Sequence, residues 1–159
     1  MMNLDDVRKR IDQLDFQLLR ILNERMELAL TSRKFKSEVT DPKREQEVLG
    51  HAIRMAPRLV GESFATGLFE IIMGESRRLQ ADNLPLVGFQ GDHGANGEMA
   101  VQSFLPDGAP IPCEGFADVF DGVEGGYLDY GVVPVENSLG GMVAQVNELM
   151  ASREFFVVG

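Results

Sequence analysis

The sequence predicts two regions of different fold class: an all-α region of three helices over residues 1–83 and a partial α/β region over residues 84–159. Charge differs between them, because residues 1–83 hold 14 of the 15 lysines and arginines against 14 acids, whereas residues 84–159 hold one arginine and 11 acids. Glycine and proline rise from 4 and 2 in the first region to 13 and 5 in the second. Apolar residues recur at helical spacing in the first region and in short strand-like runs in the second. These changes place the boundary at residues 81–85.

The composition excludes several classes of protein. The chain has 159 residues, of which 44% are apolar and 25% charged, as is typical of globular proteins. It contains no run of about 20 apolar residues and no apolar signal core near its start, so we expect a cytoplasmic protein with no membrane partner. Cys113 is the only cysteine, which excludes an internal disulfide and makes a metal site unfavourable. The acidic second region argues against a nucleic-acid partner.

The first predicted helix is unusually long for so small a region. No glycine or proline interrupts residues 4–36, which would span about 50 Å as a helix. Its apolar residues alternate steps of three and four, which is close to a heptad repeat. They are Leu4, Val7, Ile11, Leu14, Leu18, Ile21, Leu28 and Phe35. A helix of this length needs an apolar partner along its whole course, and a second copy of the chain is the simplest one.

Polar residues interrupt this stripe and suggest a ligand. On a continuous helix Arg25, Ser32 and Lys36 would lie on one inward face. Inward cations need partners, which could be Glu24 or Glu27 in the same helix or an anionic ligand. Arg8 lies 17 residues before Arg25, about 25 Å along the helix. In a two-fold antiparallel dimer it could serve the site of the other subunit.

Two further helices complete the first region. Asp41 followed by Pro42 is typical of a helix start, and Pro57 ends this second helix. Arg44 and Glu45 fall in its first turn, and His51 is expected to be at its surface or half-buried. A third helix is predicted over residues 62–81. Ser76 and Gln80 lie four residues apart on its apolar face, so both are expected to point inward.

The second region has the pattern of a parallel α/β sheet. The predicted elements are a strand at 86–89, a glycine-rich loop within 88–97, a helix ending at Phe104, a helix at 116–124, a strand at 130–135, a loop at 136–141, a helix at 142–151 and a strand at 155–158. Their order is β-α-α-β-α-β. The glycine-rich loop by itself is only a weak signal for phosphate binding, and His93 within it is expected to be solvated.

Several spaced motifs in the first region resemble the all-α chorismate mutase family, in the form that is fused to prephenate dehydratase. The motifs are residues 7–15 (VRKRIDQLD), 23–29 (NERMELA), 33–36 (RKFK), 41–45 (DPKRE) and 75–76 (ES) with Gln80. The resemblance implies an intertwined, all-helical homodimer. It also implies conversion of chorismate to prephenate by a [3,3] rearrangement that needs no metal and no cofactor.

The resemblance assigns roles to individual residues. Arg25 and Lys36 match the cations that bind the substrate carboxylates and ether oxygen, and Arg8 matches the arginine donated by the other subunit. Asp41 and Arg44 match residues that shape the pocket, and Glu45 matches the acceptor for the substrate hydroxyl. Ser76 and Gln80 match contacts from the last helix, with Gln80 at the ether oxygen.

The second region resembles the start of a prephenate dehydratase domain, which implies a lobe of periplasmic-binding-protein-like type. The matching segments are 87–91 (VGFQG), 94–98 (GANGE), 116–120 (FADVF) and 129–138 (DYGVVPVENS). Glu136, Asn137 and Ser138 match the substrate-cleft loop of that family. The family's catalytic Thr-Arg-Phe motif and its phenylalanine-binding domain have no counterpart in this sequence, so dehydratase activity is not expected from these residues alone.

Three functions therefore compete. The first is a homodimeric chorismate mutase of phenylalanine and tyrosine biosynthesis. The second is a bifunctional enzyme that also dehydrates and decarboxylates prephenate to phenylpyruvate. The third is a module without catalysis, in which the helices dimerise and the α/β segment binds a small ligand. The inward cations argue against the third.

Overall fold

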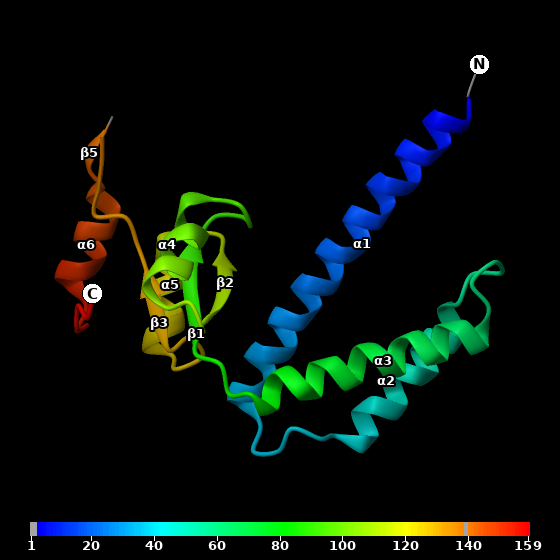
Figure 1. The fold of residues 1–159 in the computed structure, drawn as a ribbon. Coiled ribbons are helices and arrows are strands. Elements are labelled where there is room, and N and C mark those ends of the chain that lie inside the picture. The colour runs from blue at the N-terminus through cyan, green and yellow to red at the C-terminus, as the bar shows by residue number, and fades with distance from the viewer. Residues whose placement is uncertain (1–2, 139) are drawn as a thin grey trace. The chain divides into compact units, whose positions relative to one another are not determined.

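The computed structural model describes residues 3–138 and 140–159, which form two compact units, with the chain divided between Ala81 and Asp82 (Figure 1). The first unit contains α1 (Leu4–Ser32), the 3-10 turn η1 (Arg33–Phe35), α2 (Pro42–Met55) and α3 (Glu62–Ala81). The second contains β1 (Leu86–Gln90), α4 (Asn96–Phe104), β2 (Ala109–Cys113), α5 (Phe116–Glu124), β3 (Tyr130–Val132), β4 (Glu136–Asn137), β5 (Gly141–Met142) and α6 (Ala144–Ser152). The predicted fold class, helices followed by a parallel α/β region, is thereby confirmed.

Helix α1 begins where the sequence predicts and ends earlier. Asn3 caps it by accepting a hydrogen bond from the backbone N–H of Asp6 at 2.9 Å, and the Asp6 carboxylate accepts one from Asn3. At the other end the Ser32 hydroxyl donates to the Ala29 carbonyl, and the chain tightens into η1. Lys36 is already extended, with φ −139° and ψ 151°. The predicted continuous helix over 4–36 is therefore wrong in its last turn, and Lys36 does not share a helical face with Arg25.

Helices α2 and α3 match their predictions. The Asp41 carboxylate accepts a hydrogen bond from the backbone N–H of Arg44 at 3.0 Å, and Pro42 is the first helical residue. The α2 helix ends just before Pro57, whose ring would clash with a continuing helix. It packs along α3, and α3 in turn contacts α1.

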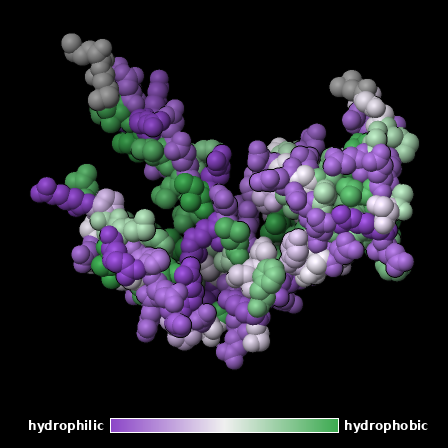
Figure 2. Space-filling model, turned by 180° about the vertical axis from the view of Figure 1, so that it is seen from behind, coloured by the Kyte–Doolittle hydropathy of each residue, from purple (hydrophilic) through white to green (hydrophobic). Residues whose placement is uncertain are grey.

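Much of α1 has no packing partner within its own unit. Every residue from 3 to 21 is exposed, and burial along the helix begins only at Leu22. The exposed residues include the whole N-terminal part of the predicted apolar stripe, and Figure 2 shows hydrophobic side chains interleaved with polar ones along this helix. An exposed apolar stripe of this length is typical of an interaction surface.

The parallel sheet has the strand order β2-β1-β3, with β1 in the centre. Side chains alternate between its two faces. Val87 and Phe89 pack with Val101 of α4 on one face. On the other face Gly88 lies against α5 and Leu128. Because helices cover both faces, the first four residues of β1 are apolar and buried, and only Gln90 at its end is exposed.

Strand β2 is absent from the sequence prediction, which has two helices in succession there. The segment contains Pro110 and Pro112, which are unfavourable in a strand because proline has no backbone N–H to donate to a neighbouring strand. The structure accommodates both because β2 is an edge strand and the prolines lie two residues apart. Their nitrogens therefore point away from β1, while the Ala109 N–H donates to the Pro85 carbonyl and the Cys113 carbonyl accepts from Gly91.

The last third of the second unit also departs from the prediction. Strand β3 ends at Val132, short of the predicted 135, and Pro134 follows without an N–H to extend the pairing. The predicted loop 136–141, of which Leu139 lies outside the described residues, contributes to a short antiparallel pair, β4 with β5. Helix α6 begins at Ala144 rather than at residue 142.

Residues 155–158 are not a strand, which corrects the prediction. Within the described residues no other segment forms a ladder with them, and a strand requires a hydrogen-bonding neighbour. Phe155 instead packs edge to face on Phe120, with ring centroids 5.2 Å apart. Nearby, Arg153 forms ion pairs with Asp121 and Glu124 of α5.

We expect Gly88→Ala to destabilise the second unit by about 1–3 kcal/mol, because the added methyl would overlap Leu128 in a buried region. Urea unfolding followed by tyrosine fluorescence would measure this, since both tyrosines lie in the second unit and the chain has no tryptophan. Gly115→Ala is the control in the same unit, because its φ of −132° suits any residue and a Cβ there would meet only the Asp118 carboxylate, at 3.5 Å. An unchanged urea midpoint for Gly88→Ala would contradict the close packing at β1.

Candidate functional site

Arg25 is the centre of the candidate site in the first unit. It lies on the part of α1 that contacts α3, and its Nη1 donates a hydrogen bond to the Ser76 hydroxyl at 2.7 Å. That hydroxyl also donates to the Ile72 carbonyl one turn earlier in α3, at 2.8 Å. The Ser76 oxygen is therefore fixed by its own helix, and it orients the guanidinium of Arg25.

A cavity of about 430 Å³ opens beside this arginine. Arg25 and Arg44 supply its two positive charges, from α1 and from the first turn of α2. The remaining lining is mostly apolar and comes from α2, α3 and their connection: Val48, His51, Ala52, Met55, Ala56, Pro57, Val60, Ala65, Leu68 and Phe69. A mainly apolar pocket with a few convergent charges is typical of a small-molecule site.

The charge of Arg25 has no counter-charge within the described residues. Burial lowers the pKa of its guanidinium from the ordinary value, and the positive charge of Arg44 lowers it further. The predicted alternative, pairing of Arg25 with Glu24 or Glu27, is wrong. Glu27 is buried and accepts a hydrogen bond from the Asn23 amide at 2.5 Å instead. Among the described residues Arg44 pairs only with Glu47, at 3.2 Å and largely exposed, so the partly buried charge of Arg25 favours an anionic ligand.

Ser76 and Gln80 both face inward, which confirms that part of the prediction. Each is only 6% exposed, and they lie one turn apart on α3. The Gln80 Oε1 atom is buried and accepts no hydrogen bond from the residues that the structure describes. A buried polar atom without a partner costs free energy, which a ligand or another chain could recover.

The structure does not bring Lys36, Asp41 and Arg8 into this cavity. Lys36 is exposed after η1, and its Nζ donates to the Val39 carbonyl at 3.0 Å. Asp41 is exposed and caps α2. Arg8 is exposed near the start of α1, where it lies 3.9 Å from Asp5. Their predicted roles at the site stay predictions.

Two residues near the site were not predicted to belong to it. Arg77 follows Ser76 and donates from Nη1 to Glu45 Oε1 at 2.6 Å, which ties α3 to α2. No local pattern could reveal this pair, because its members are 32 residues apart. His51 is predicted to be at the surface or half-buried; it is exposed and also lines the cavity. Its position two turns after Arg44 was the available signal.

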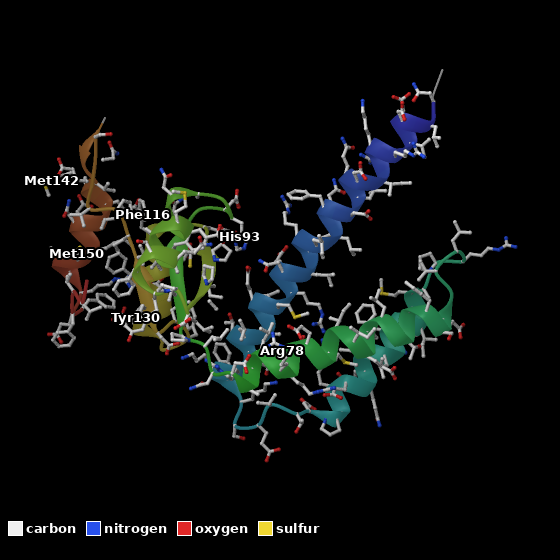
Figure 3. All side chains as sticks on the ribbon, in the orientation of Figure 1. Arg78, His93, Phe116, Tyr130, Met142 and Met150 are labelled. Carbon is white, nitrogen blue, oxygen red and sulfur yellow. The ribbon has the colours of Figure 1, made fainter. Side chains whose placement is uncertain are left out.

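In the second unit the glycine-rich loop after β1 is closed by Glu98. Its carboxylate accepts from the Gly94 N–H at 2.6 Å and lies 2.8 Å from His93 Nδ1, and Figure 3 labels this histidine. The hydrogen bond from Gly94 is the main reason that the pKa of Glu98 is lowered. His93 is thus an exposed partner of Glu98. Glu136, Asn137 and Ser138 are exposed around β4, and the Asn137 side chain accepts from the Gly140 N–H.

The arrangement of the first unit suits binding of a small anion with apolar parts. Across residues 3–138 and 140–159, no three histidine, cysteine, aspartate or glutamate side chains are grouped to hold a metal ion. In the same ranges, no helix is both long and apolar enough to cross a membrane.

Comparison with known proteins matches each unit to a family. Residues 7–81 match the family model of chorismate mutase type II, and residues 87–159 match that of prephenate dehydratase. The bifunctional chorismate mutase/prephenate dehydratase of Aquifex aeolicus is 31% identical over 166 residues, covering 100% of this chain and 46% of that protein. The protein of the same name from Escherichia coli K12 is 30% identical over 177 residues, covering 96% and 45%.

A plant protein matches a shorter part of the chain. Arogenate dehydratase/prephenate dehydratase 2 of Arabidopsis thaliana is 37% identical over 73 residues, covering 46% of this chain and 19% of the relative. No solved structure matches the chain. The chain spans about half the length of the bifunctional relatives. It consists of a domain of the chorismate mutase type II family followed by part of a prephenate dehydratase family domain.

Proposed function

We propose that this protein is a chorismate mutase that converts chorismate to prephenate in the biosynthesis of phenylalanine and tyrosine. The observation that carries the proposal is the cavity shared by Arg25 and Arg44, in which Arg25 bonds to Ser76 and to no carboxylate of the described chain. Chorismate is a dicarboxylate with an apolar ring, so its charges and shape match those of the lining.

The reaction explains why such a site needs no general base. Chorismate rearranges in one step, and the site has to hold the flexible substrate in its compact reactive form. Two arginines can clamp the two carboxylates, each through paired hydrogen bonds. Negative charge then grows on the ether oxygen as the C–O bond breaks. Lys36 and Gln80 would stabilise that charge, which is electrostatic catalysis.

We further propose that the active form is an intertwined homodimer in which Arg8 reaches the partner's site. The support is the exposure of every residue from 3 to 21, including the regularly spaced apolar residues of α1 (Figure 2). Another copy of this helix would cover the stripe along its full length. An antiparallel partner would also bring its own Arg8 toward Arg25, which a single chain keeps about 25 Å apart along α1.

For the second unit we propose the role of a partial dehydratase lobe of periplasmic-binding-protein-like type. The parallel order β2-β1-β3 places the glycine-rich loop and the segment with Glu136, Asn137 and Ser138 after the carboxyl ends of strands. Ligands of open α/β sheets bind at this edge. Dehydration of prephenate by the whole protein is the second candidate function, supported by the family match of residues 87–159.

The test is the disappearance of chorismate, followed by ultraviolet absorbance, with the product identified by chromatography. We expect the wild-type protein to form prephenate and Arg25→Ala to lose about a hundredfold or more in kcat/KM, because a carboxylate clamp and its charge are removed. Arg58→Ala, in the exposed connection between α2 and α3, should keep wild-type activity. Full activity of Arg25→Ala would refute the assigned site, and a folded wild type without turnover would refute the function.

A further inference from the structure

The ion pair between Arg77 and Glu45 stands out from the other ion pairs of the first unit. It joins two helices and has side chains that are only 38% and 33% exposed, with 2.6 Å between Nη1 and Oε1. The neighbouring pair of Arg78 and Glu75 lies within one helix, three residues apart, and is 58% and 45% exposed. Figure 3 labels Arg78 on α3. Exposed pairs of that kind contribute little free energy, whereas a half-buried pair between helices fixes both side chains.

Neither Glu45 nor Arg77 lines the cavity itself, but each is next in sequence to a residue of the site. Glu45 follows Arg44, which lines the cavity, and Arg77 follows Ser76, which binds Arg25. A lone carboxylate at this place would repel a substrate that carries two negative charges. Arg77 supplies the positive charge that offsets it.

We propose that Arg77 is a positioning residue, which neutralises Glu45 and directs one of its oxygens at the hydroxyl group of the substrate. This inference rests on the proposed function. Chorismate has two carboxylates, an ether oxygen and a single hydroxyl, and only the hydroxyl can donate a hydrogen bond. Glu45 can therefore attract the substrate only through that hydroxyl.

The contacts of Glu45 fit this role. Its Oε1 atom accepts the hydrogen bond from Arg77, and its Oε2 atom contacts no hydrogen-bond donor among the residues that the structure describes. With Oε1 held, the carboxylate cannot rotate freely, so Oε2 stays available in one direction. An oriented acceptor of this kind discriminates in favour of substrates that carry the matching donor.

The experiment compares Arg77→Gln, Glu45→Gln and the double variant on two substrates: chorismate, and the analogue in which hydrogen replaces the ring hydroxyl. For chorismate we expect Arg77→Gln to lose roughly tenfold to a hundredfold in kcat/KM, because Glu45 is left without its counter-charge. The double variant should recover part of this loss, mainly in KM, because the repulsive charge has gone. Arg78→Gln removes an arginine from the adjacent position and should leave both substrates unaffected.

The ratio of kcat/KM for chorismate to kcat/KM for the analogue shows whether Arg77 positions Glu45 for the hydroxyl or only holds α2 and α3 together. It should fall toward one in Arg77→Gln and in Glu45→Gln, and stay at the wild-type value in Arg78→Gln. Equal losses on both substrates, or additive losses in the double variant, would overturn the inference. If Arg77→Gln does not fold, Arg77→Lys is the alternative variant, because it keeps the positive charge and should keep most of the ratio. A folded Arg77→Lys protein with a normal KM but a ratio near one would also overturn the inference.

The same measurements distinguish this inference from the proposed function. Wild-type turnover of chorismate with an unchanged ratio in Arg77→Gln would overturn the role of Arg77 alone. A folded wild-type protein that turns over neither substrate would overturn both.

Discussion

Lys36→Ala is expected to lower kcat for chorismate by about a hundredfold to a thousandfold, with a smaller change in KM. The reason is that the ammonium group stabilises charge that appears on the ether oxygen only in the transition state. In the structure its Nζ contacts only a backbone carbonyl, that of Val39, so no carboxylate of the described chain competes with the substrate for it.

Steady-state kinetics of the purified variant would measure both constants. Lys43→Ala is the matched control, because Lys43 is an exposed lysine in the first turn of α2 and lies outside the proposed site. Lys36→Arg keeps the charge but replaces a compact ammonium by a planar group, so it should restore only part of kcat. A Lys36→Ala protein with wild-type kcat would place the electrostatic centre elsewhere.

Leu14→Glu is expected to abolish both the dimer and turnover. Leu14 lies in the middle of the exposed apolar stripe of α1, where a partner helix would bury it. Replacing Leu14 by glutamate removes about 1.5–3 kcal/mol of favourable apolar burial from each subunit of the dimer. Burying the new carboxylate at the interface adds the free-energy cost of desolvating its charge. Without the partner the site would also lack Arg8.

Analytical ultracentrifugation and the chorismate assay on the same samples would measure the two effects together. Gln13→Glu introduces the same charge one residue away, on another face of α1, and should leave the dimer and its activity intact. A wild-type protein that is monomeric at assay concentration and still active would contradict the proposed dimer.

Mixing inactive variants tests whether Arg8 acts across the dimer. Arg8→Ala and Arg25→Ala should each be inactive alone. A mixed dimer would contain one site with both arginines, so random reassociation should restore about a quarter of the wild-type activity. No recovery after confirmed subunit exchange would mean that Arg8 serves the site of its own chain.

Much of the helical structure was predictable because its signals are local. The start of α2 follows from Asp41 as cap and Pro42 as first residue, and its end follows from Pro57. The bounds of α3 and α5 also agree with the residue patterns. In each case a few neighbouring residues determine whether the backbone groups at a helix end find partners.

The errors arose where structure depends on distant partners. Strand β2 exists despite two prolines because β1 offers hydrogen bonds on one side only, which no pattern within 109–113 indicates. Residues 155–158 have the composition of a strand but no neighbouring strand in the described chain. The end of α1 was placed too late because helical spacing continues to Lys36, while the Ser32 hydroxyl and η1 tighten the backbone before it.

The sequence by itself determined the two regions, the helices with their caps, and the set of cations and inward polar residues of the candidate site. Only the tertiary structure decided which of them meet: Arg25 with Ser76, Arg25 with Arg44 at one cavity, and Glu45 with Arg77. The physical reason is that spacing along a chain specifies the face of a helix, whereas a contact between helices depends on how their surfaces pack against each other. Side chains 32 or 51 residues apart become neighbours only through that packing.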